Sequence, residues 1–268
     1  MTLRAVIDPS VKPCKICGAA ADVFGVVDFH KSCLESQGLK LNASGIPVYY
    51  RRCRACHFVF TDMFDEWKHE DFQRHIYNDD YIKVDPEYRD VRPAGEAKFI
   101  DSFFGAGKSE LRLLDYGGGS GLFAEALNQK GYRAETFDPF SPHNMRPQHK
   151  ADLVTAFEVI EHAAHPYQAL DDMITLLEPN GALVFSTLLQ PEDFKQFGLN
   201  WWYVAPRNGH ISIYSQDALK HLFNARGFRT VSVTSAMHIA CRDESAFTTG
   251  PLRYLQALRN AGAAGAAA

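Results

Sequence analysis

Four cysteines stand in two pairs of equal spacing, Cys14 with Cys17 and Cys53 with Cys56. Each C-x-x-C can form one tight turn around a metal ion, and two such turns supply four thiolates to a closed tetrahedral site of the structural zinc type. The alternative is a disulfide or a redox pair, but a redox pair needs only one C-x-x-C. We therefore predict a zinc ion whose role is to fold residues 1–62.

The other cysteines and the nearby histidines fit this site less well. Cys33 and Cys241 have no partner at metal-binding spacing, and we expect them to be ordinary buried thiols. His30 and His57 lie close to the two pairs and could replace a cysteine as ligands. Four thiolates, however, already satisfy the ion.

A second group of side chains that could do chemistry lies in the stretch ADLVTAFEVIEHAAHP, which contains Glu158, Glu161 and His162. His210 comes later, in the aromatic stretch NWWYVAPRNGHISIYS. We expect Glu161, His162 and His210 to be catalytic, with an imidazole or a carboxylate as general base. The alternative is structural, since His162 could cap a helix and His210 could occupy a turn. The aromatic stretch could face an acceptor or pack in a core.

A glycine-rich turn supplies the third feature, in the stretch LLDYGGGSGLFAEAL. Gly117, Gly119 and Gly121 follow an apolar run and precede a helix, so a ligand can approach the backbone and the free N–H groups of the helix. Nicotinamide enzymes prefer G-x-G-x-x-G, which would require a glycine in place of Leu122. Asp138 ends the next apolar run, where a carboxylate can accept hydrogen bonds from ribose hydroxyls.

The elements that must position these residues alternate between helix and strand. The predicted order is helix 94–104, strand 111–116, helix 121–130, strand 132–137, strand 151–157, helix 167–177, strand 182–188, helix 215–227 and strand 228–235. Such alternation predicts an α/β, Rossmann-like, mostly parallel sheet with helices on both faces and ligands beyond the carboxyl ends of the strands. Ahead of it we expect short strands at 24–29 and 45–53 in a zinc-ribbon-like module.

The motif D-x-G-x-G-x-G beginning at Asp115, the later Asp138 and the stretch 151–166 resemble class I S-adenosylmethionine (SAM) dependent methyltransferases over residues 77–240. The resemblance implies that SAM is the cofactor. It also implies that the cofactor-binding residues are Asp115, Gly117, Gly119, Asp138, Phe157 and Glu158, with Arg92 meeting the carboxylate of the cofactor. One departure is clear: the segment between Asp138 and Asp152 is too short for the usual third strand and its helix. We expect the adenine contact near Phe137, Phe140 and Phe157 instead.

Glu158-x-x-Glu161-His162 followed by His210 is similar to the pattern of ubiquinone-pathway catechol O-methyltransferases and small-RNA terminal 2′-O-methyltransferases. That resemblance implies Mg²⁺ or Mn²⁺ at Glu158, Glu161 and His162, where an ion would lower the pKa of an acceptor hydroxyl. The four-cysteine module ahead of the connector NDDY resembles the layout of bacterial sugar and natural-product methyltransferases.

These features predict a methyltransferase acting on a small molecule, with a sugar, glycan or secondary-metabolite hydroxyl as acceptor. A net charge of -4 disfavours nucleic acid as a partner. Two alternatives stay open. In one, the zinc module docks an RNA or a protein for methylation, with the arginines of YYRRCRAC. In the other, the fold binds SAM without catalysis. The sequence does not decide the oligomeric state or whether oxygen, carbon or nitrogen is methylated.

The expected organisation has four parts: the zinc module at 1–62, a connector at 63–92 that could cover the cofactor, the SAM-binding domain at 93–250, and a helix with a low-complexity tail at 251–268. In the connector, Tyr77, Tyr81 and Tyr88 could cover a ligand or pack one domain against another. No apolar run approaches the roughly 18 residues that a membrane span requires, and the amino end lacks a signal-peptide pattern. We therefore expect a cytoplasmic protein.

Overall fold

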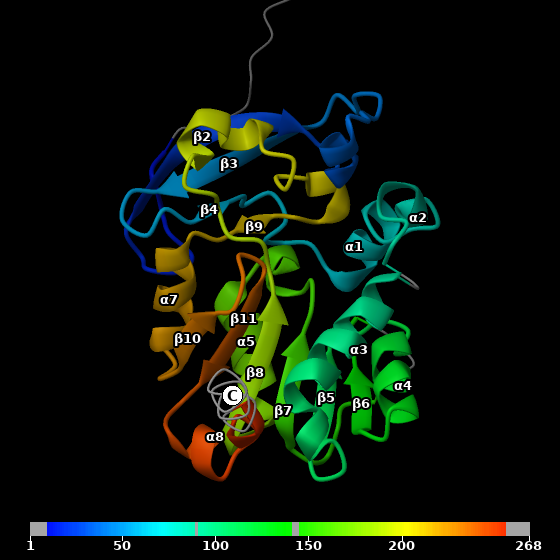
Figure 1. Ribbon diagram of the computed structural model, residues 1–268. Coiled ribbons are helices and arrows are strands. Elements are labelled where there is room, and N and C mark those ends of the chain that lie inside the picture. The colour runs from blue at the N-terminus through cyan, green and yellow to red at the C-terminus, as the bar shows by residue number, and fades with distance from the viewer. Residues whose placement is uncertain (1–9, 89–90, 141–144, 256–268) are drawn as a thin grey trace, which may run out of the picture. The chain divides into compact units, whose positions relative to one another are not determined.

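The computed structural model describes residues 10–88, 91–140 and 145–255, which form two compact units (Figure 1). The first unit comprises residues 10–85, 161–167 and 188–222, and the second comprises the remaining described residues. The units are thus interleaved along the chain, whereas the predicted division is linear. It assigned 161–167 and 188–222 to the α/β domain. The predicted low-complexity tail at 256–268 lies outside the described residues.

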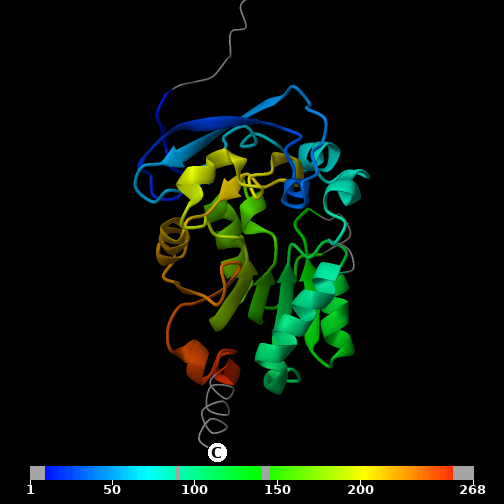
Figure 2. The same ribbon diagram turned by 45° about the horizontal axis from the view of Figure 1, so that its top comes forward.

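The second unit contains a six-stranded sheet of order β10-β11-β8-β7-β5-β6 (Figures 1 and 2). Its strands are β5 (Arg112–Tyr116), β6 (Arg133–Phe137), β7 (Ala151–Ala156), β8 (Leu177–Ser186), β10 (Arg229–Ser232) and β11 (Met237–Cys241). Strands β5 to β8 pair in parallel, and β11 pairs antiparallel with both β8 and β10. The predicted mostly parallel α/β sheet is confirmed.

Helices cover both faces of this sheet because neighbouring strand residues point to opposite sides. The helices of the second unit are α3 (Val91–Phe104), α4 (Leu122–Gln129), most of α5 (Pro166–Thr175) and α8 (Ser245–Thr248). On one face, α3 and α4 contribute Ile100, Phe104 and Leu127 to a core with Leu113 and Leu153. Helix α5 lies on the opposite face (Figure 1), and its Leu170 and Met173 are buried.

Strand β11 was not predicted from the sequence. It carries His238 in its interior, and a polar residue at that position obscures the apolar pattern of a buried strand. The structure buries His238 completely, with Nε2 2.9 Å from the carbonyl oxygen of Thr187 and Nδ1 2.9 Å from Ser232 Oγ. Both ring nitrogens are therefore hydrogen-bonded, which allows burial of the polar ring.

The shortened third-strand region is also confirmed. The described residues between β6 and β7, 138–140 and 145–150, contain no strand. Strand β6 is therefore the edge of the described sheet, and its end at Phe137 leads directly to Asp138.

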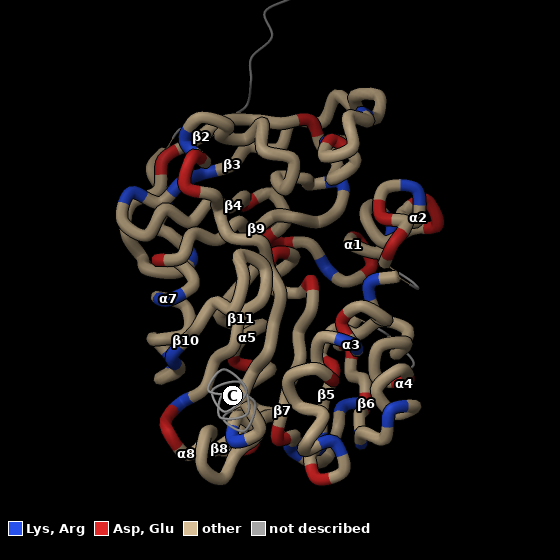
Figure 3. Tube along the Cα trace, in the orientation of Figure 1, with Lys and Arg blue, Asp and Glu red and all other residues tan. Residues whose placement is uncertain are grey.

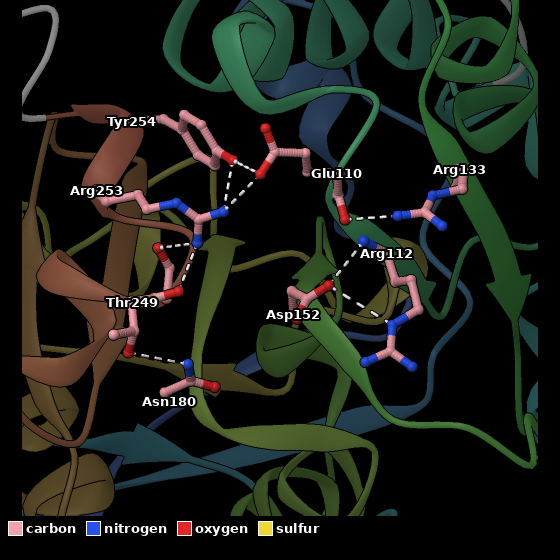
Figure 4. Close-up of polar contacts among 9 residues, drawn as sticks. Glu110, Arg112, Arg133, Asp152, Asn180, Thr249, Arg253 and Tyr254 are labelled. Carbon is pink, nitrogen blue, oxygen red and sulfur yellow. Dashed lines mark hydrogen bonds and ion pairs between the residues drawn. The ribbon is translucent and has the colours of Figure 1, made fainter.

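Ion pairs and hydrogen bonds tie the amino ends of the parallel strands together, as Figure 4 shows. The backbone N–H of Arg112 donates to Asp152 Oδ2 at 2.9 Å, and Arg133 donates to the Glu110 carbonyl oxygen at 2.6 Å. Arg253 forms an ion pair with Glu110 at 3.0 Å. Arg112 and Arg133 are the first residues of β5 and β6. These contacts therefore occupy the amino edge and leave the carboxyl edge to the glycine-rich turn.

The first unit contains a five-stranded antiparallel sheet of order β1-β2-β3-β4-β9. Its strands are β1 (Lys12–Pro13), β2 (Ala20–Asp28), β3 (Pro47–Cys53), β4 (Val59–Phe60) and β9 (Ser212–Ile213). The predicted strands at 24–29 and 45–53 correspond to β2 and β3. Strand β9 comes from the segment after β8, so a distant part of the chain completes the sheet of the cysteine module.

Short helices complete the first unit. They are α1 (His69–His75), α2 (Tyr81–Val84), α6 (Phe194–Phe197), most of α7 (Gln216–Asn224) and the 3-10 turns η1 (Cys33–Gln37), η4 (Gly198–Asn200) and η5 (Pro206–Asn208). Figure 3 shows Lys and Arg interspersed with Asp and Glu in both units. Among the described residues, no helix is both long enough and apolar enough to cross a membrane.

Candidate functional site

The four paired cysteines converge in the first unit. Cys14 Sγ lies 3.6 Å from Cys56 Sγ, and Cys17 Sγ lies 3.4 Å from Cys53 Sγ. All four sulfur atoms lie within 4.8 Å of one another. Tetrahedral coordination at a Zn–S distance of about 2.3 Å places ligand sulfurs roughly 3.8 Å apart. The spacing of these sulfurs therefore fits a single metal ion.

The backbone of both C-x-x-C turns supports the sulfur atoms. The N–H of Ile16 points to Cys14 Sγ and the N–H of Ala55 to Cys53 Sγ, each at 3.4 Å. The residue after each pair, Gly18 or His57, has a positive φ of 73° or 61°. The left-handed backbone at His57 shows that this residue completes the turn after Cys56. Neither His57 nor His30 belongs to the metal-competent groups found among the described residues.

The glycine-rich turn connects β5 to α4 in the second unit. Gly117, Gly119 and Gly121 have φ angles of 76°, 55° and 83°, which side chains rarely tolerate. Gly118 was not singled out from the sequence, yet a Cβ there would lie 1.7 Å from Asp115 Oδ2. The turn therefore needs glycine both for its conformation and for its close approach to a carboxylate.

Asp138 holds this turn from the end of β6. Its Oδ2 accepts a hydrogen bond from the N–H of Gly119 at 3.0 Å, and its Oδ1 accepts one from the N–H of Phe140 at 2.8 Å. Carboxylate oxygens can accept further hydrogen bonds. Gly119 and Asp138, both predicted as cofactor-binding residues, thus contact each other, and the carboxylate retains capacity for a ligand hydroxyl.

Several carboxyl groups gather around the end of β5, where Asp115 is buried and Glu96 is half-buried. Burial, followed by the negative charge of Asp138, raises the pKa of Asp115 to about 7, and hydrogen bonding from Thr136 and Thr155 offsets this only in part. Burial, followed by the charges of Glu158 and Asp115, raises the pKa of Glu96 to about 8. Glu96 lies on α3 and no sequence motif marked it. This concentration of carboxyl groups favours a cationic ligand.

Glu158 lies beside these groups in an unusual backbone conformation, with φ of 53°. Its N–H donates to Ser186 Oγ at 2.7 Å, and Ser186 Oγ donates to Glu158 Oε1 at 3.1 Å. Arg92 Nη1 is 4.0 Å from Glu158 Oε2. The structure therefore places the predicted residues Arg92 and Glu158 in contact with each other.

The aromatic residues near the turn divide into buried and exposed. Phe157 packs edge-on against Phe123 at 5.3 Å between ring centroids, and Phe137 packs edge-on against Tyr116 at 5.9 Å. Both are buried in the second unit. Phe140 is 53% exposed, so among the three predicted adenine contacts it alone presents an accessible ring.

Glu161, His162 and His210, here called the trio, converge in the first unit with ligand atoms within 4.8 Å of one another. Glu161 is fully buried, His210 is buried and His162 is half-buried. The ring centroids of His162 and His210 are 5.0 Å apart. The third predicted ion ligand, Glu158, lies in the second unit and is not part of this group.

Neighbouring residues shape the trio. Gly209 has a φ of 86°, and a Cβ there would lie 2.7 Å from His162 Nδ1. Tyr77 packs edge-on against His162 at 6.1 Å and is 41% exposed. Trp201 and Tyr203 are buried, so the aromatic stretch contributes mainly to packing. Cys33, half-buried rather than buried as predicted, places Sγ 3.7 Å from His210 Nδ1. Cys241 is in the core, as predicted.

A comparison with protein families matches residues 87–233 to a methyltransferase domain. The chain belongs to the methyltransferase domain family. The resemblance inferred from Asp115, the glycine turn and Asp138 is thereby confirmed at the level of the family. The match covers most of the described second unit and reaches across both segments that contain the trio.

Relatives and solved structures are more distant. The chain is 30% identical over 112 residues to a ubiquinone biosynthesis O-methyltransferase of Bradyrhizobium diazoefficiens, covering 33% of this chain and 44% of that protein. A protein of the same name from Rhodopseudomonas palustris is 29% identical over 114 residues, covering 34% and 44%. The chain thus spans less than half the length of the curated relatives it matches. A crystal structure of Synechocystis magnesium protoporphyrin IX methyltransferase with bound S-adenosylhomocysteine (SAH) also matches. Its sequence is 15% identical to this chain, and the TM-score is 0.43 over 67% of this chain and 97% of that chain.

Replacement of Asp115 by asparagine should stabilise the protein, and more so at high pH. An unfolded aspartate ionises near its ordinary pKa of about 3.9, whereas the folded Asp115 ionises at about 7. Between these values the unfolded chain binds fewer protons than the folded protein, so the free energy of unfolding falls as pH rises. Asparagine removes that loss. In urea unfolding without ligand, the gain in the free energy of unfolding should be larger by about 3 kcal/mol at pH 8 than at pH 5.

Asp79→Asn, which removes a carboxyl group at an exposed position, is the matched control. Parallel stability curves for wild type and Asp115→Asn would contradict the raised pKa.

Proposed function

We propose that the protein is a SAM-dependent methyltransferase that methylates a hydroxyl group of a small molecule. The observation that carries the proposal is the hydrogen bond from the N–H of Gly119 to Asp138, at the carboxyl edge of the parallel strands. Ligands of such sheets bind at this edge. A glycine turn held by a strand-ending carboxylate suits a nucleoside with vicinal hydroxyls, and the nearby carboxyl groups suit a ligand with a sulfonium and an ammonium charge.

In this proposal each part of the second unit contacts a different part of the cofactor. Asp138 accepts hydrogen bonds from the ribose hydroxyls, and Phe140 offers a ring for the adenine. Gly117 and Gly119 let the backbone approach, while Asp115 faces the cationic methionine portion. Arg92 is assigned to the carboxylate of the cofactor, for which it would exchange its contact with Glu158.

When bound, SAM would supply a methyl group that the positive charge of its sulfonium sulfur activates, and the sulfur would leave with the electron pair of the broken carbon–sulfur bond as a neutral thioether. The remaining task is to orient the acceptor and to remove its hydroxyl proton. We assign that task to the trio. Its imidazoles and its carboxylate can accept the proton at nitrogen or oxygen. In the sequence, Glu161 and His162 follow directly on the fourth-strand motif of the family.

The trio also fits a divalent ion. One carboxylate and two imidazole groups, with ligand atoms within 4.8 Å of one another, form the donor set, with His210 in the place predicted for Glu158. Of the two predicted ions, Mn²⁺ fits better than Mg²⁺, because Mg²⁺ prefers oxygen ligands and the set contains two nitrogens. An ion held there would lower the pKa of the acceptor hydroxyl.

For the acceptor, we favour a sugar or a secondary-metabolite hydroxyl over a macromolecule. The net charge of -4 gives no excess of cations for binding a phosphate backbone. The curated relatives are named ubiquinone biosynthesis O-methyltransferases, a name that denotes O-methylation in the biosynthesis of a small molecule. Tyr77, exposed beside His162, offers an aromatic face to a planar ligand or a sugar ring.

Calorimetry with SAM and SAH, followed by an acceptor screen with methyl-labelled SAM, tests the function. We expect both nucleosides to bind, a nicotinamide dinucleotide not to bind, and label to appear on a small hydroxylated acceptor. Binding of the dinucleotide alone would overturn the proposal. Label on RNA or protein, lost steeply as salt rises, would favour a macromolecular acceptor. Binding without transfer to any acceptor would favour a non-catalytic SAM-binding protein.

His210→Ala should lower kcat by roughly 100-fold to 10,000-fold, the range for loss of a general base. SAH affinity should stay within about twofold, because the proposed cofactor contacts all lie in the second unit. His30→Ala is the matched control, since His30 lies in the first unit and contacts the carbonyl oxygen of Asn42 instead of the trio. Unchanged kcat in His210→Ala would remove His210 from the catalytic residues.

We propose a structural zinc ion for the four cysteines. Elemental analysis should find one zinc per chain in wild-type protein and less than half of that in Cys17→Ser, because one thiolate is lost from a closed site. Cys241→Ser, in the core of the second unit, is the control for general destabilisation and should retain its zinc. Zinc-free wild-type protein in which all four thiols react freely would refute this site.

A further inference from the structure

Tyr203 makes contacts to two members of the trio at once. It is 3% exposed, its ring lies 4.2 Å from the ring of His210, and its hydroxyl group is 2.6 Å from Glu161 Oε1. We propose that Tyr203 is the positioning residue that fixes Glu161 and His210 for the binding of a divalent ion. The inference rests on the ion site proposed above and names the residue that builds it.

The hydroxyl group of Tyr203 has a fixed direction of donation. The backbone N–H of Leu188 donates to the phenolic oxygen at 3.1 Å, so that oxygen serves as acceptor on one side. A phenol has one proton to donate. That proton therefore points to Glu161 Oε1, and the short contact fixes the carboxylate within the protein interior. The hydroxyl group of Tyr203 thereby holds one of the two carboxylate oxygens of Glu161 in place.

The backbone of Tyr203 orients His210. Its carbonyl oxygen lies 2.9 Å from His210 Nδ1. A carbonyl oxygen can only accept, so Nδ1 carries the proton of the neutral ring and Nε2 has the lone pair. Metal-binding histidines are commonly held in this way, with the second ring nitrogen donating to a backbone carbonyl. The tilted contact between the two rings limits rotation of the imidazole.

These contacts place one buried residue behind two of the three ligands. Tyr203 holds one carboxylate oxygen of Glu161 through its hydroxyl group and Nδ1 of His210 through its carbonyl oxygen. Phenylalanine at this position would keep the ring contact and the carbonyl but would remove the hydroxyl donor. Glu161 would then lose its hydrogen bond from Tyr203 while remaining fully buried. Loss of such outer contacts typically weakens metal binding about 10-fold to 100-fold.

The experiment is a Mn²⁺ titration of zinc-loaded protein, in which free Mn²⁺ is measured by electron paramagnetic resonance. Wild type, Tyr203→Phe and Tyr167→Phe are compared. Tyr167 is the matched control because it also lies in the first unit and its hydroxyl donates to the carbonyl oxygen of Ile16 at 2.9 Å, away from the trio. Zinc content and SAH affinity, measured on each variant, establish that it is folded.

We expect Tyr203→Phe to bind Mn²⁺ about 10-fold to 100-fold more weakly than wild type, with SAH affinity unchanged and Tyr167→Phe equal to wild type. Equal Mn²⁺ affinity in wild type and Tyr203→Phe would overturn the positioning role alone. A wild type that binds SAH but no Mn²⁺ would overturn both the ion site and the role of Tyr203, and would leave the methyltransferase proposal standing. Equal weakening in both tyrosine variants would also overturn the positioning role.

Discussion

A carboxyl group buried away from cations raises the free energy of the folded state, and the second unit holds one at the end of its central strand. Asp115 is 3% exposed and its neighbours include further carboxyl groups, Asp138, Glu96 and Glu158. Such an arrangement is tolerated because the sheet around it is well packed. It is useful when a cationic ligand completes it. The glycine turn passes beside Asp115, since a Cβ at Gly118 would lie 1.7 Å from its Oδ2, and the charge of Asp138 adds to the rise of its pKa.

The first unit uses a different means to fix its polar groups. There, Glu161 and His210 are buried with hydrogen bonds to one tyrosine, so their orientation is set by packing and by the backbone. Gly209 allows His162 to come close, since any Cβ at that position would collide with the imidazole. The same unit contains the metal-competent cysteine group, and one of its members, Cys53, ends β3, which pairs with β4, the partner of β9.

The interleaving of the two units has a physical origin in strand pairing. Segment 188–222 leaves the α/β sheet after β8 and contributes β9, which pairs with β4 of the cysteine module. Strands β4 and β9 have only two residues each, which is too short to show a period in the sequence. Their pairing therefore could not be predicted from the sequence. A methyltransferase domain that matches 87–233 therefore includes residues that pack with the amino-terminal module.

The amino-acid sequence alone determined the family and the order of its major elements. Local signals suffice for these, because the period of apolar residues, the glycine turn and the two C-x-x-C pairs each lie within a few residues. The pairing of Asp138 with Gly119 could likewise be expected, since adjacent parallel strands end at one edge.

Only the tertiary structure decided which distant side chains meet. It placed His210 rather than Glu158 with Glu161 and His162, added Glu96 to the acidic groups around Asp115, and put Tyr203 behind the trio. It also buried Phe157 in the core and left Phe140 exposed. These outcomes depend on packing between segments far apart in the chain, and no local periodicity or spacing encodes such contacts.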